Sequence, residues 1–301
     1  MPEITEFEEK EYENPLNHQL LLTSNNLWTP GQVFEKIFGI DAAILATDIS
    51  FWRLFGHVGV PDGVQLNTYS WSFLWSFIHK TMRKFPSFKV NLLIQAKRPS
   101  YRLGVNAGYA KYGIKNHYWQ FKVTPHQQII LEKLETKLAT DALVVYACPS
   151  FHKFADLDRH ISSGQIVANS TFVKPSKLVG HSKWVYDQPG TNGLGCSKIE
   201  KHTDIKFEEQ LEKLFSLTGN DNEKSQNEAL KNLIKLENYS IEICSELQES
   251  NPIAKAYLNR RQRIVDIIKE TNTDENNIEA VRSFLSFGIF TSTLNTTWLT
   301  I

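Results

Sequence analysis

The chain has 301 residues, with 33 basic and 33 acidic side chains and a hydrophobic content of 41%. This composition excludes general disorder and is sufficient for one large domain, or for a core domain with an accessory region. The three cysteines lie far apart with no CxxC spacing, which argues against a zinc ribbon or a disulfide scaffold and is typical of a reducing compartment.

The N-terminal segment, residues 1–27, is acidic and lacks the layout of a signal peptide, so we expect a loosely ordered lead-in. The longest apolar-looking run, residues 71–78, is too short to cross a bilayer. These features predict a cytoplasmic protein without a membrane partner.

A first helix is predicted to begin after Thr29, because Thr29 can cap it, Pro30 suits the first helical position and Gln32 completes a capping box. Gly39 is expected to end this helix. The apolar run 40–46 then predicts a short strand, interrupted by Asp41.

The segment 89–148 predicts the centre of the fold. Strands are expected at 89–97, 118–123 and 141–148, and a helix at 124–140, whereas 98–117 is expected to form a long loop or an insertion. Alternating strands and helices predict an α/β fold with a mixed sheet flanked by helices, over a domain of residues 28–200. Apolar stripes at helical spacing predict a helical region over 201–301.

Basic residues are concentrated in one part of the chain. No acidic residue occurs between Asp62 and Glu132, while aromatic residues are frequent there. Such a segment suits a surface that follows a phosphate backbone, although a solvated face paired with acids from elsewhere is the alternative. The basic residues expected to bind DNA are Arg98, Arg102, Lys111, Lys115 and Lys122.

Gln95 and Lys97 end an apolar strand and are two residues apart, so their side chains point to the same face. Packing alone does not require this arrangement. Together with Asp41 and Glu35 it could hold a divalent metal beside a phosphate, since Mg²⁺ prefers carboxylate and other oxygen ligands and a lysine can offset developing charge. The residues therefore favour a metal-dependent nuclease.

The segments GID (39–41) and IQAKR (94–98) resemble the core of the PD-(D/E)XK nuclease superfamily, in particular Mrr-type restriction endonucleases and Holliday-junction resolvases. The resemblance covers about residues 30–150 and implies a restriction-endonuclease-like fold. By position it implies that Glu35 is the helix acid, Asp41 the metal-binding aspartate, Gln95 the variable residue before the lysine, and Lys97 the catalytic lysine. It further implies that Gln127 or Gln128 lines the site, where Gln127 is expected to contact DNA.

The same resemblance implies that Asp41, Gln95 and Glu35 bind Mg²⁺, or Mn²⁺ in its place. It implies a DNA endonuclease, with a role in bacterial anti-phage defence and a C-terminal region that binds a partner or a second copy of the chain. Two departures stand out: Gln95 replaces an acid by a neutral amide, and the literal Pro-Asp pair occurs at Pro61-Asp62, which makes Asp62 a rival to Asp41.

Two other functions remain open from the sequence. The nuclease core could bind nucleic acid or assemble with partners without catalysis, and the missing acid at Gln95 would be its signature. A pure protein-interaction scaffold leaves the basic segment and the end of the 89–97 strand unexplained. His152 and His160 lack a clear third ligand, and His181 is expected to be a packed or surface histidine rather than a substrate ligand.

Overall fold

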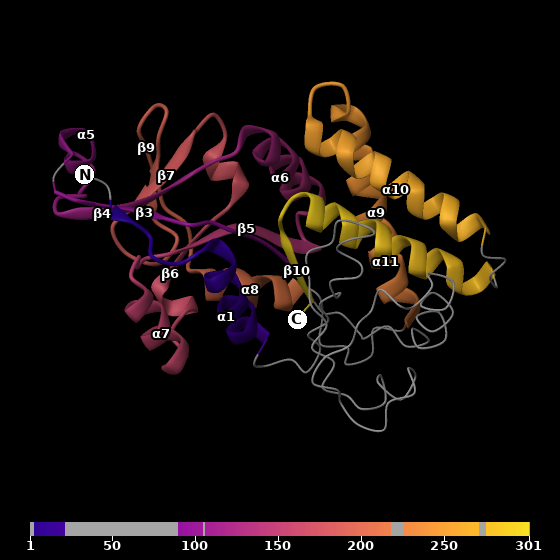
Figure 1. The fold of residues 1–301 in the computed structure, drawn as a ribbon, viewed down its shortest axis with the longest axis horizontal. Helices are drawn as coiled ribbons and strands as arrows, with labels where there is room; N and C mark the ends of the chain where they lie inside the picture. The colour runs from indigo at the N-terminus through magenta and orange to yellow at the C-terminus, as the bar shows by residue number, and fades with distance from the viewer. Residues whose placement is uncertain (1–2, 22–89, 105, 218–225, 271–274, 301) are drawn as a thin grey trace. The chain divides into compact units, whose positions relative to one another are not determined.

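The computed structural model describes residues 3–21, 90–104, 106–217, 226–270 and 275–300 (Figure 1). These residues form an α/β protein with a mixed sheet and a helical C-terminal region, as the sequence predicted, and with a second, antiparallel sheet that it did not predict. The chain divides into two compact units. The first comprises Met1–Asn26, Phe88–Asn222 and Asn295–Ile301, and the described residues of the second are 226–270 and 275–294.

Two sheets organise the first unit. The four-stranded sheet has the order β10-β2-β5-β6, in which β2 and β5 are parallel and the other pairs antiparallel. The six-stranded sheet has the order β1-β3-β4-β7-β8-β9 and is antiparallel throughout. The strands are β1 (Glu3–Ile4), β2 (Asn91–Ala96), β3 (Ser100–Leu103), β4 (His117–Lys122), β5 (Ala142–Pro149), β6 (Ser170–Val173), β7 (Lys183–Tyr186), β8 (Gly193–Gly195), β9 (Glu200–His202) and β10 (Thr297–Thr300).

The predicted β-α-β unit is confirmed. Strand β2 is followed by β3 and β4 of the other sheet, and helix α6 (Pro125–Leu138) then leads to β5, which is parallel to β2; every residue of β2 and β5 is buried. Such continuous apolar strands suit a parallel pair that is covered on both faces. Alternate residues of β2 face opposite sides, so Leu92 and Ile94 join the core with helices α1 (Glu9–Leu21) and α8 (Phe207–Leu217), whereas Gln95 faces α6.

The N-terminal segment is more ordered than the expected lead-in, because residues 9–21 form helix α1. Tyr12 and Leu16, one turn apart, are fully buried in the core of the four-stranded sheet, and the Tyr12 hydroxyl donates to Ser170 Oγ at 2.8 Å. Pro15 lies inside this helix, where proline is unfavourable. The burial of Tyr12 and Leu16 in the core therefore outweighs the unfavourable effect of Pro15 on the helix.

The expected loop over 98–117 is wrong for much of its length. Strand β3 and the short helix α5 (Ala107–Ala110) lie within it, and β3 pairs with both β1 and β4. Asn106 caps α5, since its side chain accepts from the backbone N–H groups of Gly108 and Tyr109. The polar residues of this segment thus build a hairpin arm of the six-stranded sheet.

The helical C-terminal region contains α9 (Gln226–Leu247), α10 (Pro252–Glu270) and α11 (Glu275–Thr293), which pack on one another in the second unit. The last residues of the chain return to the first unit, because β10 pairs antiparallel with β2. The contiguous domain ranges expected from the sequence stay a prediction. Helix α7 (Phe154–Ser162) completes the helices described in the first unit.

The helix predicted after Thr29 and the strand predicted over 40–46 lie outside the described residues. Among the residues that the structure does describe, none of the helices combines the length and the apolar character needed to span a membrane.

A buried charge lies in the interior of the second unit. Glu237 in α9 is 1% exposed, and it accepts from Arg261 Nη2 in α10 at 2.9 Å and from Ser283 Oγ in α11 at 2.6 Å. One carboxylate therefore connects three helices. A buried charge of this kind is costly unless its partners remain in place.

We expect Glu237→Ala to lower the free energy of unfolding by about 3–5 kcal/mol, because it leaves Arg261 without its buried partner. Urea denaturation followed by circular dichroism measures this change. Glu242→Ala is the matched control, since Glu242 lies on the same helix and is exposed. Equal losses in both variants would contradict the structural role of Glu237.

Candidate functional site

Strand β2 brings Gln95 and Lys97 to one face at the point where the strand ends. Gln95 is fully buried and Lys97 is 9% exposed. The backbone N–H of Lys97 donates to the Ala147 carbonyl at 2.8 Å, which extends the pairing with β5 by one residue. The backbone of Lys97 is therefore held by the sheet.

Gln127, in the first turn of α6, joins these two side chains. Lys97 Nζ donates to Gln127 Oε1 at 2.8 Å, and Gln127 Nε2 donates to Gln95 Oε1 at 2.5 Å. Lys97 sets the donor and acceptor roles in this series of hydrogen bonds, because an ammonium group can only donate. Gln127 must then turn its oxygen to Lys97 and its amide nitrogen to Gln95.

The side-chain oxygen of Gln95 is fully occupied by hydrogen bonds in this arrangement. Its oxygen also accepts from Thr296 Oγ1 at 3.2 Å, and its amide nitrogen donates to the Ala96 carbonyl at 3.0 Å. A carbonyl oxygen has two lone pairs, and both have donors here. Coordination of a metal by Gln95 would require the exchange of at least one of these bonds.

Helix α1 adds carboxylates that the sequence analysis did not single out. Glu9 and Glu13 lie one turn apart, and Glu9 interacts electrostatically with Lys97. Burial raises the pKa of Glu9 above its ordinary value, while the positive charge of Lys97 opposes that shift. Glu13 is 4% exposed and forms an ion pair with Lys10 at 2.9 Å.

The same burial affects the lysine. Removal from water lowers the pKa of Lys97 below its ordinary value, and the Glu9 carboxylate partly restores the charged form. A desolvated lysine beside a carboxylate is a perturbed pair of the kind that is found at reactive sites, although structural ion pairs also produce it. Its Nζ also lies 5.7 Å from the centre of the Tyr146 ring.

Strand β10 and the residues just before it contact the carboxylates of α1. Asn295 Nδ2 donates to Glu9 Oε1 at 2.8 Å, and Thr297 Oγ1 donates to Glu13 Oε1. Residues from both ends of the chain therefore meet beside β2. The only signal for Glu9 in the sequence is its place in the first turn of an amphipathic segment, which Pro15 obscures.

The structure thus brings together three of the predicted site residues: Gln95, Lys97 and Gln127. Gln128 points elsewhere, because its oxygen accepts from the Tyr146 hydroxyl at 2.7 Å and its nitrogen donates to the Pro175 carbonyl. Glu35 and Asp41, and the rival Asp62, lie outside the described residues, so their places in the site stay predictions.

The predicted DNA-binding residues occupy different environments. Lys111, Lys115 and Lys122 are exposed, whereas Arg98 forms an ion pair with Glu8 at 2.9 Å and Arg102 is half-buried. Gln127 is buried and bonded to Lys97, which suits a positioning residue better than a DNA contact. The neighbouring aromatic residues pack on one another: the Tyr101 ring stacks on His152 with ring centres 4.0 Å apart.

No protein-family model matches the chain, and no curated protein and no solved structure matches it either. The chemistry of the site can be stated from its own groups. Lys97 offers a fixed positive charge and hydrogen-bond donors, and Glu9 offers a carboxylate of raised pKa. Together they could bind and polarise an anionic oxygen or exchange a proton with a water molecule.

We expect Glu9→Gln to lower the pKa of Lys97 further, because it removes the carboxylate that favours the charged ammonium. A nuclear magnetic resonance titration of ¹³C-lysine-labelled protein, with Lys97 assigned through Lys97→Arg, measures the shift. Glu11→Gln is the matched control, since Glu11 is exposed in the same helical turn. A Lys97 pKa that stays constant or rises in Glu9→Gln would show that the two groups do not interact.

Proposed function

We propose that this chain is a metal-dependent DNA endonuclease with a PD-(D/E)XK-type core. The observation that carries the proposal is the end of strand β2, where Lys97 is held by Gln127 and interacts with the Glu9 carboxylate. The β2-α6-β5 unit around it has the order of elements that the resemblance implies. Lys97 and Gln95 share the same face, in agreement with their expected roles.

Each described residue has a role in this proposal. Lys97 positions the attacking water or offsets negative charge that develops on the phosphate. Gln127 is a positioning residue that orients the lysine ammonium. Glu9 takes the place of the helix acid, in competition with Glu35, because Glu9 is the carboxylate found to interact with Lys97.

The fit to Mg²⁺ is incomplete among the described residues. Glu9 supplies a carboxylate, but the Gln95 oxygen already accepts from Gln127 and Thr296. The remaining oxygen ligands would come from Asp41 or Asp62, and from Glu35. When bound, Mg²⁺ or Mn²⁺ would stabilise charge on the phosphate and lower the pKa of a bound water.

The biological setting follows from the resemblance alone. We propose DNA as the substrate, the cytoplasm as the location and anti-phage defence as the role. Helices α9, α10 and α11 would then control activation or assembly, with a protein partner or a second copy of the chain. The exposed Lys111, Lys115 and Lys122 support a contact with a nucleic-acid backbone, since each can neutralise a phosphate.

One observation favours a second candidate function, a nucleic-acid-binding or assembly module without catalysis. Gln95 is neutral and its oxygen is occupied by two donors, so the position cannot add negative charge for a metal. In this case DNA binding would persist and would not respond to metal.

Incubation of supercoiled plasmid with the full chain in Mg²⁺ or Mn²⁺ tests both candidates. We expect metal-dependent nicking, and we expect Lys97→Ala to reduce its rate at least about a hundredfold, because the lysine acts on the developing charge. Lys213→Ala is the matched control, since Lys213 is exposed on α8 and is not among the residues expected to bind DNA. Circular dichroism verifies that each variant is folded.

Two pairs of variants assign the acids. Asp41→Ala against Asp62→Ala identifies the metal-binding aspartate, and Glu9→Gln against Glu35→Gln identifies the helix acid. Nicking by Lys97→Ala at the wild-type rate would refute the proposed site. Absence of nicking together with DNA binding that is equal with and without metal would support the second candidate, and absence of both would refute the two functions together.

A further inference from the structure

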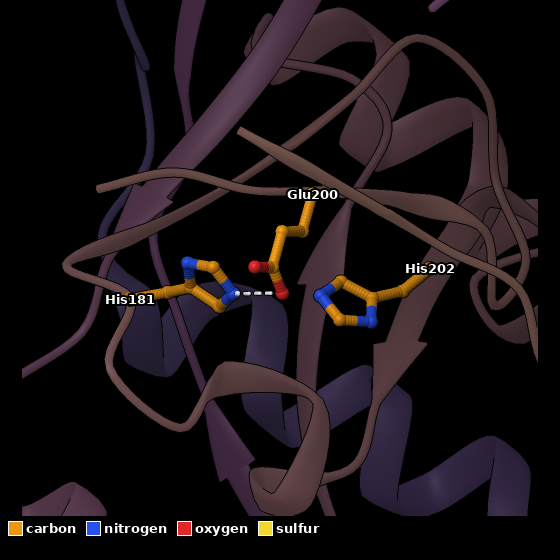
Figure 2. A group of neighbouring side chains, drawn as sticks. All are labelled: His181, Glu200 and His202. Atoms are coloured by element: carbon orange, nitrogen blue, oxygen red, sulfur yellow. Dashed lines mark ion pairs between the residues drawn. The ribbon is translucent and has the colours of Figure 1, made fainter. Parts of the chain in front are cut away.

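A second cluster of polar side chains lies at the edge of the six-stranded sheet. Figure 2 shows the imidazole rings of His181 and His202 on either side of the Glu200 carboxylate. One ligand atom from each residue lies within 4.8 Å of the other two, and His181 Nε2 is 3.6 Å from Glu200 Oε2. That ion-pair distance is longer than an ordinary hydrogen bond.

The sheet positions these three residues directly. Glu200 and His202 are alternate residues of β9, so their side chains share one face. His181 precedes β7, and the antiparallel order β7-β8-β9 brings it opposite them. Residues almost 20 positions apart in the sequence therefore meet through two short strand connections.

The two glycines of β8 leave room for neighbouring side chains, Gly195 for His181 and Gly193 for Trp184. Gly195 pairs with Glu200 and Gly193 with His202. A Cβ atom at Gly195 would collide with the ring of His181, and one at Gly193 would collide with the indole of Trp184. The absence of a side chain at Gly195 therefore allows the His181 ring to lie against β8, close to Glu200 of β9.

The His202 imidazole is only partly satisfied by the protein. Its Nε2 is buried and has no hydrogen-bond partner in the described structure, and in Figure 2 this nitrogen is directed at the Glu200 carboxylate. A neutral imidazole nitrogen is the form that binds a metal.

We propose that His181, Glu200 and His202 form a binding site for a divalent transition-metal ion of the zinc type. Two imidazoles and one carboxylate are a ligand set that zinc accepts, and it differs from the all-oxygen set that magnesium prefers. The site is therefore distinct from the proposed nuclease centre and does not depend on it. Three protein ligands would leave one position of a tetrahedral zinc ion open.

The charges around the cluster act in both directions. Glu200 favours a bound cation, whereas Lys177 adds a positive charge that acts on His202. The pattern His-x₁₈-Glu-x-His cannot be recognised as a metal site from the sequence, because the strand pairing is what brings His181 close to β9.

Zinc binding by the full chain, after removal of metal with a chelator, tests this site. We expect one tightly bound Zn²⁺ per chain in a competition titration against a colorimetric chelator. We expect His181→Ala and His202→Ala to weaken binding at least about tenfold, in line with the loss of a direct ligand. His126→Ala is the matched control, because His126 is exposed on α6, away from the three ligands in the sheet.

A further variant guards against misfolding. Glu200→Gln changes an exposed side chain by one atom and is expected to preserve the fold, yet it should also weaken zinc binding. A rise of the melting temperature with Zn²⁺ should appear in the wild type and in His126→Ala but not in the three ligand variants. No bound zinc in the wild type, or binding that is equal in Glu200→Gln and the wild type, would overturn the proposal.

Discussion

The buried ammonium of Lys97 is the constraint on which the first unit depends. A desolvated cation at the end of a central strand is unfavourable unless it has a hydrogen-bond acceptor and a negative charge nearby. Gln127 supplies the acceptor and Glu9 supplies the charge. The first turn of α6 and the first turn of α1 therefore both interact with the same end of β2.

The two ends of the chain converge on that strand. Strand β10 lies beside β2, and its approach places Thr296 against Gln95 and Asn295 against Glu9. The candidate site is therefore assembled from segments that are far apart in sequence. The hydrogen bonds of Asn295 and Thr296 also hold the segment in which the chain returns from the second unit to the first. The candidate site therefore depends on the pairing of β10 with β2.

The sequence predicted the β2-α6-β5 unit well, because apolar runs and a capped helix are local patterns. It also predicted that Gln95 and Lys97 share a face, which follows from the strand period alone. It did not predict Glu9, since Pro15 and a run of acids obscured the α1 helix. His181, Glu200 and His202 were missed as a group because strand pairing, and not spacing, brings them together.

The amide at Gln95 has a physical reason that is independent of catalysis. Its nitrogen donates to the Ala96 carbonyl while its oxygen accepts from Gln127 and Thr296. An ionised glutamate here would keep the two donors but would set a second oxygen against the Ala96 carbonyl, which is repulsive in a buried position. The fold as described therefore requires a neutral group with a donor at position 95. A nuclease built on this strand must take its negative charge from elsewhere, and the Glu9 carboxylate, which interacts electrostatically with Lys97, is the described group that can provide it.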